Sequence, residues 1–123
     1  MSKRAFTEAF FTQFHEFLKQ LTQVFPGDSD FPAYDSALSF MQRMNPGMVI
    51  SEFKTNVFPY EKILRAKNSD FFLSHKFDDV LSADMSMEAI IMKLKGLWSG
   101  LSDKSRDSIW TYIILLLDIA KRC

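Results

Sequence analysis

The amino-acid sequence predicts an all-α fold: a single-domain bundle of five to six helices over residues 1–123. Apolar residues recur at intervals of three or four, as one face of an α-helix requires. Prolines, glycines and polar residues interrupt this pattern at spacings that suit helices joined by short connections. No stretch shows the alternation typical of a strand. The 14.3 kDa mass fits one domain with its own core.

The first predicted helix runs from about Arg4 to Phe25 and is stopped by Pro26 and Gly27. Its main apolar stripe consists of Phe6, Phe10, Phe14, Phe17, Leu21 and Val24. A second row beside this stripe consists of Phe11, Leu18 and Phe25. A face this wide indicates a helix that is buried on two sides or one that also meets a partner. The second row is therefore a candidate partner surface, which a homodimer would bury in a symmetric patch.

Two further helices are expected on either side of Asn45-Pro46. This pair ends the second helix and supplies the N-cap and first-turn proline of the third. The second helix has an apolar face made of Ala37, Leu38, Phe40, Met41 and Met44. Pro59 is expected to kink or break the third helix, because proline lacks the backbone donor and clashes with the preceding turn.

An irregular segment near residues 68–85 is expected to cross the bundle, held by its aromatic side chains. Two adjacent phenylalanines on irregular backbone cannot easily both face one small core, so Phe71 and Phe72 join the candidate partner surface. Beyond this segment, Ser86 and Ser102 are expected to cap two more helices, the first of which closes at Gly100. The last helix is the most apolar.

Charge and cysteine content narrow the class of protein. Fifteen basic and fifteen acidic residues balance, whereas nucleic-acid-binding proteins usually carry a strongly basic field. Cys123 is the only cysteine, so no intrachain disulfide can form and a reducing interior is expected. The longest apolar run, residues 113–117, is far shorter than the roughly 20 residues that cross a bilayer. We therefore expect an intracellular protein without a membrane span, not a secreted one.

The two histidines are the first candidates for chemistry, since histidine is the commonest general base near neutral pH. His15 is adjacent to Glu16, but neighbouring residues on a helix point about 100° apart and form a poor pair. His75 lies near three acidic residues, Asp70, Asp78 and Asp79, in the irregular segment. These acids either solvate a loop and cap short turns or have a chemical role, and the sequence leaves this open.

Other signatures of catalysis or ligand binding fail. Asp28-Ser29-Asp30 resembles the start of a calcium loop, but Ala33 occupies the position that requires glycine. The glycines are too few and isolated to cradle a phosphate. We therefore predict a protein that is not an enzyme and has no catalytic residue, cofactor or metal.

A group of basic residues suggests an alternative function, the binding of nucleic acid or another anionic ligand. It consists of Lys54, Lys62, Arg65 and Lys67. These residues either form a patch that binds nucleic acid or another anionic ligand, or make up a solvated helix face.

The methionines also have two interpretations. Met44, Met48 and their companions either line an adaptable partner groove or fill the core, and we expect core filling.

Several landmarks together resemble a family of small helical proteins encoded by nucleocytoplasmic large DNA viruses. They are Asn45-Pro46, Phe53, Pro59-Tyr60, Ile63, the block from Asp70 to Leu73, Trp98, Leu101, Lys104, Ile109-Trp110 and Tyr112. The resemblance spans roughly residues 10–120. It implies a viral origin, with the host cell cytoplasm or the virion as location, and it carries over no active site.

The sequence therefore predicts a non-enzymatic protein–protein interaction or structural module, with a protein partner and with self-association as a homodimer left open. A nucleic-acid-associated accessory protein is the alternative. Phe11→Glu is expected to separate the two, because it would break a dimer at the second row but leave nucleic-acid affinity nearly unchanged.

Overall fold

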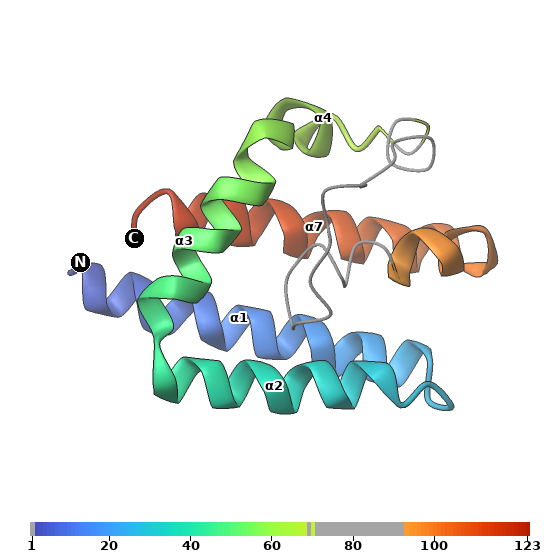
Figure 1. Cartoon of the computed structure of the whole chain (residues 1–123). Helices are drawn as coiled ribbons and strands as arrows, with labels where there is room; N and C mark the ends of the chain where they lie inside the picture. The colour runs from blue at the N-terminus through green and yellow to red at the C-terminus, as the bar shows by residue number, and fades with distance from the viewer. Residues whose placement is uncertain (1, 69, 71–92) are drawn as a thin grey trace.

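The computed structural model describes residues 2–68, 70 and 93–123, and these parts contain α-helices and short 3₁₀ turns without any strand. The elements in chain order are α1 (Lys3–Val24), α2 (Asp30–Met44), α3 (Pro46–Val57), η1 (Phe58–Tyr60), α4 (Glu61–Arg65), η2 (Trp98–Gly100) and α7 (Asp103–Ala120) (Figure 1). The predicted all-α class is confirmed. Nearly all of the expected crossing segment lies outside the described residues.

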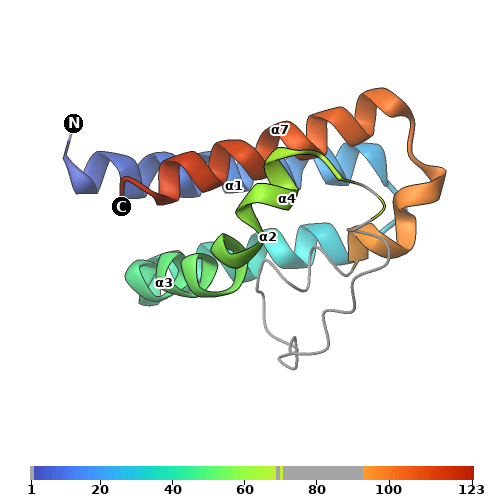
Figure 2. The same cartoon turned by 90° about the horizontal axis from the view of Figure 1, so that it is seen from above.

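Helix α1 is the centre of the described bundle. It packs against α2 on one side and α7 on the other, and both of these helices run antiparallel to it (Figure 1). Helix α3 leaves the end of α2 and crosses toward α7, which α4 also contacts. The two chain termini lie close together at one end of the molecule, as the view from above also shows (Figure 2).

The helix ends follow the local sequence signals. The Asn45 side chain accepts a hydrogen bond from the Met48 backbone N–H at 3.2 Å, and Pro46 takes the first position of α3. The Ser102 hydroxyl accepts in the same way from the Ser105 N–H at 3.1 Å and caps α7. At Pro59 the α-helix gives way to the 3₁₀ turn η1, which confirms the predicted break.

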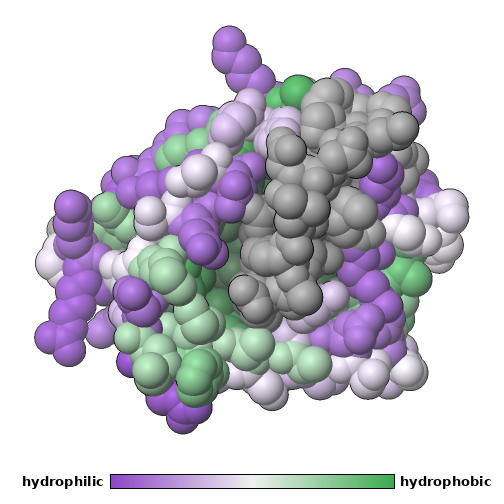
Figure 3. All heavy atoms as spheres, viewed as in Figure 1, coloured by the Kyte–Doolittle hydropathy of each residue, from purple (hydrophilic) through white to green (hydrophobic). Residues whose placement is uncertain are grey.

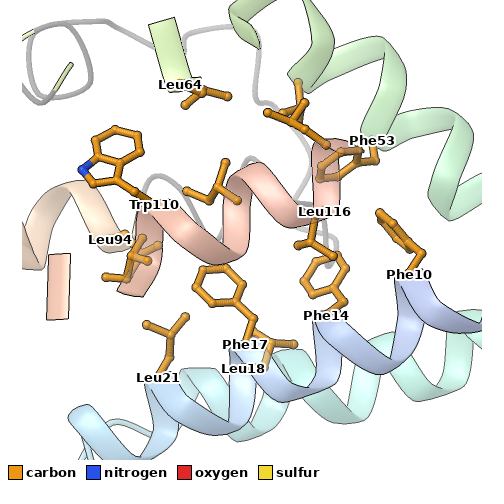
Figure 4. Packing of buried hydrophobic residues seen from close by; sticks show 14 of the residues in the cluster. Phe10, Phe14, Phe17, Leu18, Leu21, Phe53, Leu64, Leu94, Trp110 and Leu116 are labelled. Carbon is orange, nitrogen blue, oxygen red and sulfur yellow. The ribbon is translucent and has the colours of Figure 1, made fainter. Parts of the chain in front are cut away.

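The core is a continuous cluster in which several aromatic rings meet edge to face (Figure 4). The ring centroid of Phe10 lies 5.8 Å from that of Phe14 and 5.1 Å from that of Phe53, so α1 and α3 share one aromatic contact. Trp98 and Trp110 meet in the same manner at 5.4 Å. Helix α7 contributes Ile109, Trp110, Ile113, Leu116, Leu117 and Ala120 to the cluster.

Arg106 ties the start of α7 to the turn before it. Its guanidinium donates to the carbonyl oxygen of Trp98 at 3.1 and 3.0 Å and to that of Ser99 at 3.3 Å. The same group lies 5.9 Å from the centroid of the Trp98 ring. These contacts satisfy carbonyl groups at η2 and hold the turn against α7.

Candidate interaction surface

The structure buries most of the second row of the first helix. Phe11 is 1% exposed and Leu18 is fully buried, so these two side chains belong to the core of the single chain. Phe25 is half-buried and stacks on Phe31 of α2, with ring centroids 5.6 Å apart. The prediction that Phe11 and Leu18 form a partner surface is therefore wrong: α1 is buried on two sides because α2 and α7 flank it. Phe71 and Phe72 lie outside the described residues.

Four large apolar side chains are exposed among the described residues, and three of them lie at the corner where α2 meets α3. The exposed fractions are 54% for Phe40, 67% for Met44 and 40% for Met48. We call these three side chains the corner surface. Figure 3 shows hydrophobic residues gathered at the lower left, over this corner. The expectation that the methionines fill the core is wrong for Met44 and Met48.

The corner surface has a fixed backbone. Phe40 and Met44 are four residues apart on α2 and therefore lie on one face of that helix. Asn45 ends α2 by donating its N–H to the Met41 carbonyl at 2.8 Å and begins α3 with its side-chain cap. Asn45 is thus the last cap of α2 and the first cap of α3. Met48, in the first turn of α3, is therefore held close to the end of α2.

The fourth exposed apolar side chain, Val24, lies elsewhere. It lines a shallow cavity of about 200 Å³ between α1 and α7, together with Leu21, Lys104 and Ile109. Val24 is the last residue of α1, far from the N-terminus of the chain, and it does not extend the corner surface.

Three of the four basic residues of the alternative hypothesis contact acidic or carbonyl partners. Lys54 donates to the main-chain oxygen of Cys123 at 3.3 Å, and Lys67 forms an ion pair with Asp107 at 2.9 Å. Arg65 bonds both Glu61, at 2.7 Å, and Asp118. The Lys62 side chain is exposed and makes no ion pair or hydrogen bond within the described parts of the chain.

These contacts connect α3, α4 and the residues just after α4 to α7 and the residues that follow it. Glu61 also binds Lys121 of the segment after α7, at 2.5 Å. Hydrogen bonds from Lys121 and then Arg65 lower the pKa of the Glu61 carboxyl, while the bond to Asp118, followed by that to Glu61, raises the pKa of Arg65. The charges that suggested an anionic-ligand patch therefore join helices, which leaves Lys62 as the member without a partner among the described residues.

His15 takes part in a contact that the sequence did not reveal. Its Nδ1 lies 2.5 Å from the Asp35 carboxylate and its Nε2 lies 2.9 Å from the Gln42 side-chain oxygen, both on α2. A shallow cavity of about 540 Å³ lies beside His15 and Asp35, with Lys19 and Ser36 among its lining residues. Both ring nitrogens of His15 therefore lie within hydrogen-bond distance of side chains of α2, and His15 links α1 to α2. No signal in the sequence pairs residues 20 and 27 positions apart.

The aspartates that resemble a calcium loop have another partner. Lys93 Nζ lies 2.8 Å from Asp28 and 2.7 Å from Asp30, so the loop after α1 is tied to the helical residues 93–97. Hydrogen bonds with Asp28 and Asp30 raise the pKa of Lys93, and the bond from Lys93 lowers the pKa of Asp28. In the part of the chain described, no three histidine, cysteine or acidic side chains are grouped to hold a metal ion. His75, Asp78 and Asp79 lie outside it, and Asp70 is exposed.

Comparison with known proteins adds no relative: no protein-family model, no curated protein and no solved structure matches the chain. The resemblance to viral proteins therefore stays a prediction. Among the helices of residues 2–68 and 93–123, none has both the length and the apolar composition that crossing a membrane requires.

Proposed function

We propose that this protein is a non-enzymatic interaction module that binds a protein partner through the corner surface. The observation that carries the proposal is the exposure of Phe40, Met44 and Met48 together at one corner. Single exposed apolar residues are ordinary on protein surfaces, but a contiguous group of large ones marks a site of interaction.

The chemistry of these side chains suits a protein partner. Aromatic residues and methionine are enriched at protein–protein interfaces, and methionine adapts its shape because its thioether chain is unbranched and flexible. The three side chains lie where two helices meet, at the end of α2 and the start of α3, and all three are apolar.

The test is site-specific photo-cross-linking in cells that produce the full chain. A photoreactive amino acid replaces Met44, which is 67% exposed and tolerates a larger side chain. The matched control replaces Lys104, an exposed residue on the first turn of α7 at the far end of the molecule. We expect a discrete product heavier than 14.3 kDa from position 44 only. Equal products from both positions, or none from position 44, would contradict the proposal.

A further inference from the structure

We infer that the partner at the corner surface is a second copy of this chain, placed by a twofold axis between Met44 and Met48. This inference rests on the proposed function, because it names the partner of the same surface. Its basis is a pair of opposite charges that flank the apolar side chains, one on each helix.

The two charges are Arg43 on α2 and Glu52 on α3. Arg43 follows Phe40 by three residues and Glu52 follows Met48 by four, so each lies on the same helix face as an apolar member of the corner surface. Both side chains are exposed, and neither forms an ion pair or hydrogen bond with a residue that the structure describes. Arg65 and Lys93, in contrast, are paired with carboxylates of the described residues.

A surface of this kind is complementary to itself. In a twofold interface the same patch of each copy meets the other. If one residue of the first copy contacts a second residue of the other copy, the second residue of the first copy contacts the first residue of the other. With the axis between Met44 and Met48, Arg43 of one copy faces Glu52 of the other, and this pair occurs twice. The apolar side chains then meet at the centre and the charges form the rim, which is the usual anatomy of an interface.

The charge of the whole molecule is compatible with this arrangement. Fifteen basic and fifteen acidic residues cancel, so two copies do not repel each other at neutral pH. Three apolar side chains are a small hydrophobic centre compared with the roughly 800 Å² that each partner buries in a stable complex. We therefore expect a weak dimer that dissociates on dilution through the micromolar range.

Charge reversal tests the arrangement by sedimentation equilibrium of the full chain. Arg43→Glu and Glu52→Arg each place like charges opposite one another, so we expect each variant to dissociate at least about tenfold more readily than the wild type. The double variant restores opposite charges and is expected to dimerise within about threefold of the wild type. The matched control is Lys62→Glu, which makes the same change of charge on α4, away from the corner.

Each outcome decides the question. All four variants are expected to keep the wild-type helical circular dichroism and urea midpoint, because none of the three residues has a partner within the described chain. Recovery in the double variant supports the twofold arrangement. A dimer that is indifferent to the single changes, or no recovery, would overturn it. A wild type that stays monomeric while Met44 still cross-links to a different protein would overturn the second copy as partner and leave the proposed function standing.

Discussion

At the scale of the residue, Phe11 and Phe40 show that the same side chain takes opposite roles according to the helices around it. Both occupy apolar stripes in the sequence, yet Phe11 is 1% exposed and Phe40 is 54% exposed. Helix α1 has neighbours on two sides, so its second row is covered. The outer face of α2 at its end lacks such a cover, and Phe40 stays in contact with solvent.

This contrast predicts a large difference in stability between two identical substitutions. Phe11→Ala is expected to lower the free energy of unfolding by about 3–5 kcal/mol, because it removes a buried ring and leaves a cavity. Phe40→Ala is expected to change it by no more than about 0.5 kcal/mol, as at other exposed sites. Urea unfolding measures both values.

A gentler substitution keeps this prediction testable if Phe11→Ala does not fold. Phe11→Leu is expected to cost about 1 kcal/mol, since it keeps most of the apolar volume. Equal, small effects at positions 11 and 40 would show that Phe11 is not part of the core.

At the scale of the element, the helix ends were predictable because their signals are local. Asn45, Pro46 and Ser102 act through bonds to residues within three positions, and Pro59 acts on its own preceding turn. The all-α class followed from the same short-range periodicity. Whether the second row of the first helix is core or partner surface was not predictable, because the spacing of Phe11 and Leu18 fits burial on two sides as well as contact with a partner. The His15 contact with Asp35 depends on how α1 and α2 are aligned, which no short-range pattern encodes.

Ion pairs help to hold helix α4 against α7, and the packing of α4 is therefore expected to depend on pH. The pKa of Glu61 lies below its ordinary value of 4.5 because Lys121 and Arg65 bind the carboxylate. A carboxyl whose pKa is lowered by folding stabilises the protein above its ordinary pKa, and this stabilisation is lost as the pH falls through the lowered value.

We therefore expect Glu61→Gln to destabilise the protein at neutral pH and to match the wild type in acid. The difference in urea midpoint should shrink as the pH falls below 4.5 and vanish once Glu61 of the wild type is protonated. Glu16→Gln is the matched control, because the Glu16 side chain is exposed and has no ion pair or hydrogen bond among the described residues. A Glu61→Gln effect that is constant from neutral pH to acid would contradict the role of the carboxylate charge.

At the scale of the whole molecule, the described helices close their apolar faces around α1 and leave the corner surface open. The packing of α2 and α7 on α1 buries most of the aromatic side chains of the first helix, so this helix does not offer the partner surface expected from the sequence. The corner surface offers three exposed apolar side chains, with Arg43 and Glu52 beside them, two opposite charges that have no ion pair with any residue that the structure describes. The proposed binding between two copies would pair both charges.

The most direct test is the mass of the purified protein in solution, measured by light scattering from about 5 to 500 μM. We expect the mass to rise from 14.3 kDa toward twice that value with concentration. Met44→Glu is expected to stay at 14.3 kDa throughout, because it places a charge at the centre of the interface while the fold is unchanged. A wild type that remains at 14.3 kDa at the highest concentration, or a Met44→Glu variant that associates as the wild type does, would contradict the account.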